Sequence, residues 1–275
     1  MHVSEIDTPA LVVDLDIMER NLARVADYSR EHNLRLRPHT KTHKSVRLAK
    51  RQIELGAAGL TVAKVGEAEI MLGAQPDDVL VAFPIIGRAK LARLMEVARR
   101  TRVTVALDNA LAAQALSDAA RAAQVEVGVL AEMDVGLGRV GVAPGEVLQL
   151  AQTMEKLPHL RFEGITFYAG HIKSVDESGL EAVARVSEMV RGVLDQFRTA
   201  GIEPRIVSGG STPTLFHSHE FDGLTEIRPG TYVFNDVNTV LSGGCVMEDC
   251  AASILATVVS TARPGHMIID GGSKT

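Results

Sequence analysis

Short apolar runs rich in β-branched residues alternate along this chain with longer stretches in which apolar positions recur every three or four residues. Eight runs have the length and composition of strands, at residues 34–37, 59–63, 79–82, 103–107, 125–132, 161–167, 205–208 and 224–227. Helical stretches lie between the strands or ahead of the first, for example at residues 16–31, 90–99 and 109–123. This alternation predicts repeated β/α units around a parallel sheet.

Eight such units within roughly 200 residues predict an α/β fold of the closed (β/α)8 TIM barrel type over residues 1–240. An open doubly wound sheet is the alternative, but the early Gly-x-Gly-x-x-Gly turn typical of that fold is missing. After Pro229-Gly230 the pattern changes, and residues 253–261 and 266–270 resemble two strands joined by residues 262–265. Because the chain stops just after an apolar strand, we expect residues 241–275 to be the truncated start of a C-terminal β-domain.

Composition narrows the class of protein further. The formal net charge is −5, and the basic residues are scattered without aromatic residues beside them, so nucleic-acid binding is not expected. The apolar runs are far shorter than the ~20 residues that span a bilayer, and the N-terminus lacks the pattern of a secretory signal. The two cysteines, Cys245 and Cys250, suit a reducing cytoplasm, where we expect the protein to reside.

In a barrel of this type, reacting groups lie at the C-terminal ends of the strands and in the loops that follow. Lys41 follows the first strand in a dense polar cluster, and a desolvated lysine near other cations has a free amine that attacks carbonyls. Arg139 follows the fifth strand among glycines, where its planar donors suit a carboxylate or phenolate oxygen. The structural alternatives are a solvated basic loop for Lys41 and an ordinary turn for Arg139.

Three further loops carry unusual residues. Tyr168-Ala169-Gly170-His171 follows the sixth strand, although a tyrosine packed in the core is an alternative reading. After the seventh and eighth strands, glycines and hydroxyl groups predict a nest of backbone N–H groups that binds a phosphate dianion. Its residues are Gly209, Gly210, Ser211, Thr212, Gly230 and Thr231, followed by Tyr232. Plain glycine turns are the alternative here.

A phosphate cradle, an imine-forming lysine, an arginine and a tyrosine at one rim are the parts that a pyridoxal 5'-phosphate site requires. A metal-dependent barrel hydrolase is a second interpretation, because some histidine spacings could hold zinc. The histidines concerned are His39, His43, His171, His217 and His219.

Six segments, in order along nearly the whole chain, resemble the D-threonine aldolase and eukaryotic-type D-serine dehydratase family, whose barrel is shared with alanine racemases. They begin at Thr8, Arg37, Asp134, Tyr168, Ser208 and Glu226, and the Pro-His-x-Lys-Thr-His-Lys run at 38–44 is the most specific. The resemblance implies that Lys41 binds the cofactor through an imine and that Arg139 lies beside its ring. It also implies that Ser211, Thr212, Gly230 and Thr231 hold the phosphate, and that Tyr168 and Tyr232 line the pocket.

The resemblance also implies a lyase that acts on D-β-hydroxy amino acids, and a homodimer. Retro-aldol cleavage to glycine and an aldehyde would need a base such as His39, His43 or His171 for the β-hydroxyl proton. In the dehydratase alternative, Lys41 takes the Cα proton, the β-hydroxyl group is lost, and the products are ammonia and a 2-oxo acid. A barrel that binds the cofactor without catalysis is a third possibility.

Family members with an intact C-terminal domain hold a divalent metal, Mn or Zn, on a His-x-Cys or His-x-Asp pair. In this chain we expect no such ligands before residue 275.

Overall fold

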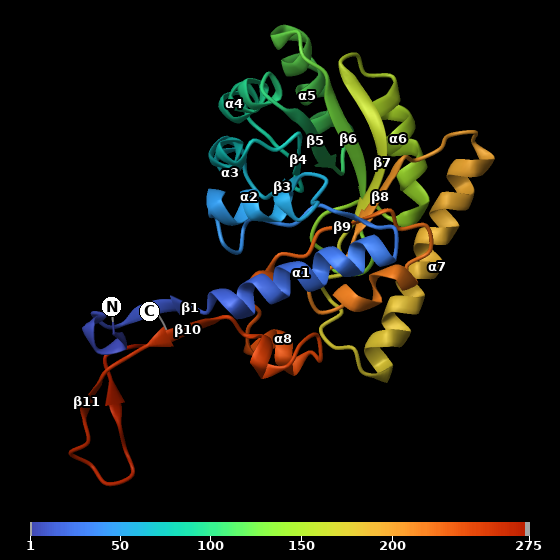
Figure 1. The fold of residues 1–275 in the computed structure, drawn as a ribbon. Helices are drawn as coiled ribbons and strands as arrows, with labels where there is room; N and C mark the ends of the chain where they lie inside the picture. The colour runs from blue at the N-terminus through green and yellow to red at the C-terminus, as the bar shows by residue number, and fades with distance from the viewer. Residues whose placement is uncertain (1, 273–275) are drawn as a thin grey trace.

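The computed structural model describes residues 2–272, and their main feature is a parallel sheet in the order β2-β9-β8-β7-β6-β5-β4-β3 (Figure 1). Each of the eight predicted strands is present. Their bounds are Arg35–Leu36 (β2), Leu60–Val62 (β3), Asp78–Val81 (β4), Arg102–Leu107 (β5), Val127–Met133 (β6), Leu160–Phe167 (β7), Ile206–Gly209 (β8) and Glu226–Ile227 (β9).

Backbone hydrogen bonds join the two ends of this sheet. The Thr61 N–H donates to Pro38 O and the Thr40 N–H donates to Thr61 O, each at 2.9 Å, and His39 forms a parallel bridge with Thr61. The segment that follows β2 therefore pairs with β3, and the strands close into a ring. The predicted TIM barrel is confirmed, and the open doubly wound sheet is excluded.

Helices cover the outside of the barrel (Figure 1). They are Leu15–Glu31 (α1), Val46–Glu54 (α2), Val65–Met71 (α3), Arg88–Ala98 (α4), Ala110–Ala123 (α5), Val147–Glu155 (α6), Glu177–Thr199 (α7) and the short Val237–Leu241 (α8). The predicted helices correspond to α1, α4 and α5. Between β8 and β9 the chain forms the 3-10 helix Leu215–Glu220 (η4). Helices on the outer face bury the strands on both sides, which explains why strands such as β6 are apolar almost throughout.

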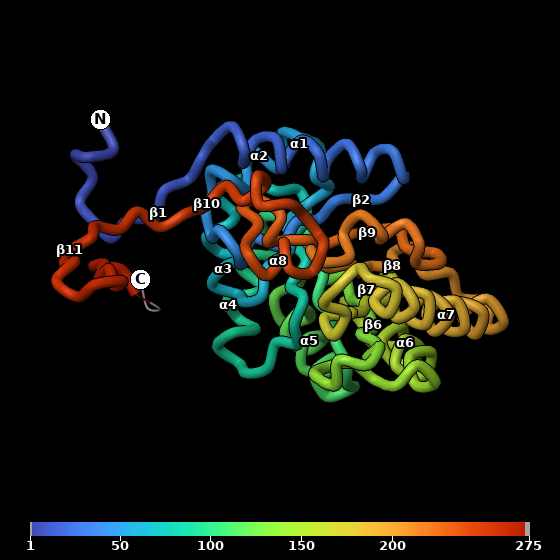
Figure 2. Tube along the Cα trace, turned by 90° about the horizontal axis from the view of Figure 1, so that it is seen from below, coloured from blue at the N-terminus to red at the C-terminus, as the bar shows by residue number. Residues whose placement is uncertain are grey.

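The N-terminal and C-terminal segments lie side by side and project away from the barrel in both views (Figures 1 and 2). Ala10–Val13 (β1) pairs antiparallel with Ala252–Leu255 (β10), and Val258–Ser260 (β11) pairs with Ile268–Ile269 (β12). The prediction of one strand over 253–261 was wrong. The chain changes partner there, because β10 pairs with β1 whereas the Thr257 N–H donates to the Asp270 carboxylate at 2.8 Å. Within residues 2–272, no helix is long and apolar enough to cross a bilayer.

Candidate active site

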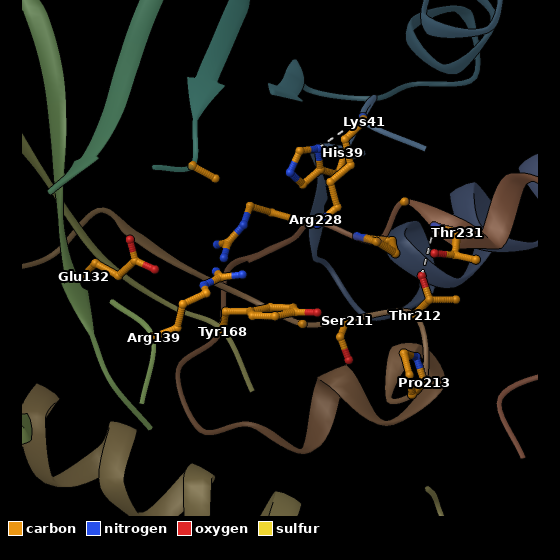
Figure 3. Close-up of a pocket in the computed structure, with 14 residues that line it drawn as sticks. His39, Lys41, Glu132, Arg139, Tyr168, Ser211, Thr212, Pro213, Arg228 and Thr231 are labelled. Atoms are coloured by element: carbon orange, nitrogen blue, oxygen red, sulfur yellow. Dashed lines mark hydrogen bonds between the residues drawn. The ribbon is translucent and has the colours of Figure 1, made fainter. Parts of the chain in front are cut away.

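A cavity opens at the rim where the strands end, and it is lined by residues from the end of β6 and from the loops after β2, β4, β6, β7, β8 and β9 (Figure 3). Parallel strands bring these loops together although they are far apart in the sequence. The lining residues are His39, Lys41, Ala82, Glu132, Arg139, Tyr168, Gly210, Ser211, Thr212, Pro213, Arg228, Pro229, Gly230 and Thr231.

Lys41 lines this cavity. Its Nζ is 5.9 Å from the centroid of the Tyr168 ring, close enough for a cation–π interaction. Partial burial lowers the pKa of Lys41, and the positive charges of Arg139 and Arg228 lower it further. A lowered pKa increases the fraction of neutral amine, which is the form that attacks a carbonyl carbon.

Arg139 reaches the same tyrosine ring from the loop after β6, with its Cζ 5.1 Å from the ring centroid. Asp134 shapes that loop, because its carboxylate accepts the N–H groups of Gly136 at 3.0 Å and Gly138 at 3.1 Å. Partial desolvation raises the pKa of Asp134, but the backbone hydrogen bonds together outweigh it, so the pKa is lowered. Tyr168 thus lies against two cations that come from two different loops.

The loops after β8 and β9 form a polar concavity. Gly210 has φ of +82°, a conformation that glycine adopts without strain, and the Thr231 N–H donates to Thr212 Oγ1 at 3.2 Å. In the described part of the chain, the buried backbone N–H groups of Gly210, Ser211 and Gly230 have no hydrogen-bond acceptor. Buried N–H groups without partners beside a cavity are suited to an anion.

Two charged lining residues, Arg228 and Glu132, were missing from the predicted site. Arg228 follows β9, is 8% exposed, and donates to Thr166 Oγ1 at 2.7 Å and to Ser208 Oγ at 2.6 Å. It is a charged residue at the end of a strand, so the rule that identified Lys41 could have identified it too. The residues predicted from this loop were Gly230, Thr231 and Tyr232 instead.

Glu132 is the last but one residue of β6 and points toward the guanidinium groups of Arg139 and Arg228 (Figure 3). Burial raises its pKa to about 7, and the two arginines only partly oppose this effect. Its Oε2 atom is buried and has no hydrogen-bond partner among the described residues. An acid within an otherwise apolar strand was the available sequence signal.

The three histidines considered as bases lie in different surroundings. His39 lines the cavity, and burial together with Lys41 and Arg228 lowers its pKa to about 3. His43 lies outside the cavity lining, its Nδ1 accepts the Ser45 N–H at 3.0 Å, and burial lowers its pKa. His171 is exposed in the loop after β7 and also lies outside the lining.

Gly209 and Tyr232, also predicted as cofactor residues, lie behind the cavity lining. Gly209 packs against the Phe167 ring, and the buried hydroxyl of Tyr232 accepts a hydrogen bond from Gln52 Nε2 at 2.9 Å. No group of three or more metal-ligating side chains is found between residues 2 and 272. His219, considered above as a zinc ligand, stacks on His32 with ring centroids 4.0 Å apart.

Fold and site together define a (β/α)8 barrel whose last two loops line one cavity with Lys41. The family model described as "Alanine racemase, N-terminal domain" matches residues 13–237, and the chain belongs to this family. D-threonine aldolase from an Arthrobacter species is 34% identical over 282 residues, which cover 99% of this chain and 73% of the relative. D-threo-3-hydroxyaspartate dehydratase from Delftia sp. is 36% identical over 276 residues, with 97% and 72% covered.

A crystal structure of D-threonine aldolase from Filomicrobium marinum superposes with a TM-score of 0.93 at 33% identity. It matches 98% of this chain and 75% of that protein. The similarity to these lyases agrees with the resemblance read from the six sequence segments.

Proposed function

We propose that this protein is a pyridoxal 5'-phosphate-dependent lyase of D-β-hydroxy amino acids, with retro-aldol cleavage to glycine and an aldehyde as its reaction. The observation that carries the proposal is the position of the Lys41 amine in one cavity with Arg139, Arg228 and the unpaired N–H groups of Gly210 and Gly230. The named activities of the relatives support the same reaction class.

The residues present fit the cofactor. A phosphate dianion matches the buried N–H groups at Gly210, Ser211 and Gly230, since these donors lack acceptors among the described residues. A side chain at Gly230 would press against the loop after β2, because its Cβ would lie 2.8 Å from the His39 carbonyl oxygen. We assign phosphate binding to Ser211, Thr212, Gly230 and Thr231.

Lys41 would bind the cofactor covalently through its amine. Tyr168 offers a flat aromatic surface, and Arg139 and Arg228 offer hydrogen-bond donors to acceptor atoms of the ring and of the substrate. When bound, the cofactor withdraws electrons from the substrate bond that breaks at Cα. The loops decide which bond is oriented for cleavage, so their geometry selects the reaction.

The aldolase reaction also needs a group that accepts the β-hydroxyl proton. In His39, Nδ1 accepts the Lys41 backbone N–H at 3.4 Å, so the neutral ring carries its hydrogen on Nε2. With a pKa of about 3, His39 is a weak base and suits hydrogen-bond donation. We therefore propose His171 as the proton acceptor, with His43 as the less accessible alternative.

Dehydration is the second candidate reaction, because the dehydratase relative is as similar to this chain as the aldolase is. In that reaction the freed amine of Lys41 takes the Cα proton. Cofactor binding without catalysis is the third possibility, and we propose a homodimer for each of them.

Product analysis tests the proposal. The protein is incubated with pyridoxal 5'-phosphate and D-threonine, D-serine or D-threo-3-hydroxyaspartate, and glycine plus aldehyde are assayed beside ammonia plus 2-oxo acid. We expect glycine, an absorbance band near ~420 nm, and a borohydride-reduced adduct that peptide mapping places on Lys41. Lys44, in the same loop, is the control residue, and an adduct on Lys44 would overturn the assignment. A band without turnover would favour the non-catalytic barrel.

A further inference from the structure

The interior of the barrel contains a continuous series of buried polar contacts that ends at Arg228. Ser208 on β8 and Thr166 on β7 both accept hydrogen bonds from Arg228 Nη1, at 2.6 and 2.7 Å. The Phe167 carbonyl oxygen accepts from Nη2 at 3.0 Å. Ser208 and Thr166 are at most 1% exposed.

These contacts leave part of the guanidinium group free. A guanidinium has five N–H donors, and the three hydrogen bonds above use both donors of Nη1 and one of Nη2. The Nε donor and the second Nη2 donor have no hydrogen-bond partner among residues 2–272. Figure 3 shows the guanidinium in the cavity, so these donors are available to a ligand there.

The Glu226 carboxylate sets the direction of the Ser208 hydroxyl group. Ser208 Oγ donates its single hydrogen to Glu226 Oε1 at 2.7 Å, so it can only accept from Arg228. Glu226 is itself held, because its Oε2 accepts from Arg37 Nε at 2.8 Å. The carboxylate of Glu226 therefore turns the lone pairs of Ser208 toward Arg228.

We propose that Ser208 and Glu226 are positioning residues, which fix the guanidinium of Arg228 so that its two free N–H donors face the bound cofactor and substrate. Neither residue lines the cavity, and both act through Arg228. The identity of the ligand rests on the proposed function, whereas the positioning of Arg228 by Ser208 and Glu226 does not.

Ser208→Ala and Ser208→Cys test the inference. The first removes the hydroxyl group, and the second keeps the volume but hydrogen-bonds weakly. Ser187→Ala is the matched control, because Ser187 on α7 is also a buried serine but lies away from the cavity. Its hydroxyl group donates to the Glu220 carbonyl oxygen at 3.1 Å. Thermal unfolding of all variants shows whether each one folds.

Two measurements are made on each variant. Rotation of the Arg228 guanidinium is followed by NMR in ligand-free protein with isotope-labelled arginine, with the signal assigned through Arg228→Lys. The Kd of pyridoxal 5'-phosphate is measured by absorbance titration. In both Ser208 variants the Arg228 guanidinium should rotate faster, and pyridoxal 5'-phosphate should bind about tenfold more weakly. This is the effect expected from the loss of one hydrogen bond to a charged group. Ser187→Ala should change neither property.

Unchanged rotation in both Ser208 variants would overturn the inference, as would faster rotation with an unchanged Kd. If the unsubstituted protein does not bind pyridoxal 5'-phosphate, the proposed function fails. The NMR comparison would still decide whether Ser208 positions Arg228.

Discussion

Arg37 and Glu226 form an ion pair in the centre of the barrel, with Nε donating to Oε2 over 2.8 Å and side chains that are 1% and 0% exposed. The pair joins the segment after β2 to β9, the two strands that are neighbours at the end of the sheet order. Asp78 on β4 accepts a second hydrogen bond from the same guanidinium. Arg37 therefore ties three strands together beneath the cavity.

Arg37→Met should destabilise the protein by about 3–5 kcal/mol, because it leaves the Glu226 and Asp78 carboxylates buried without their partner. The free energy of unfolding from denaturant titration measures the loss. Arg51→Met is the control, since Arg51 pairs with Glu19 on the surface, where both side chains are about 40% exposed. Its loss should be much smaller. Equal losses in the two variants would contradict a special role for the buried pair.

Arg139→Leu should raise the pKa of Lys41, because after burial the charge of Arg139 is the largest cause of the lowered value. Amine reactivity at neutral pH should then fall, as more of the lysine is protonated. Reductive methylation of the ligand-free protein over a pH series, with mass spectrometry of the Lys41 peptide, gives the midpoint directly. Arg99→Leu, at an exposed helix end, should leave the midpoint in place. If the titration midpoint of Lys41 also stays unchanged in Arg139→Leu, the charge of Arg139 does not lower the pKa of Lys41.

The barrel was predictable because β-branched runs and amphipathic stretches repeat eight times, and parallel strands between helices are apolar on both faces. The pairing of β1 with β10 was not. The four residues of β1 contain no pattern that indicates pairing with a strand some 240 positions later. The break between β10 and β11 likewise depends on which strand each segment meets, which periodicity does not encode.

The candidate site was predictable to the extent that polar residues follow apolar strands. Lys41, Arg139, Tyr168 and the glycine loops were found in this way. Glu132 lies inside its strand, so whether its carboxyl group points into the cavity depends on the tilt and register of β6 in the closed barrel. Tyr232 is the opposite case, a predicted site residue that does not line the cavity. Its position in the sequence next to Thr231 does not reveal that its hydroxyl group accepts a hydrogen bond from Gln52.

Gly230→Ala should weaken binding of pyridoxal 5'-phosphate by about tenfold or more, the scale of one lost hydrogen bond to a charged group. The added Cβ would lie 2.8 Å from the His39 carbonyl oxygen and 3.0 Å from Thr42 Oγ1, so the loop has to shift and its backbone N–H groups with it. Absorbance titration measures the affinity. Gly145→Ala is the control, because a Cβ there meets no atom within 4 Å. Wild-type affinity in Gly230→Ala would remove this loop from the phosphate site.

Glu132→Gln should change how stability depends on pH. The carboxyl pKa is about 7 in the folded protein against 4.5 as its ordinary value, so between these pH values the folded state holds a proton that the unfolded chain has released. Raising the pH from 5 to 8 therefore removes the contribution that the protonated Glu132 carboxyl group makes to the free energy of unfolding. Glutamine does not titrate, so the variant should gain stability relative to the wild type over this range.

The relative gain should be on the order of 3 kcal/mol at most, because one unit of pKa corresponds to about 1.4 kcal/mol. Denaturant titrations at pH 5, 6, 7 and 8 measure it in the ligand-free protein. Glu155→Gln, at the exposed end of α6, is the control and should show a pH dependence parallel to that of the wild type. If Glu132→Gln is parallel as well, the Glu132 carboxyl group ionises in the folded protein as it does in water, and the arginines that it faces must neutralise it fully.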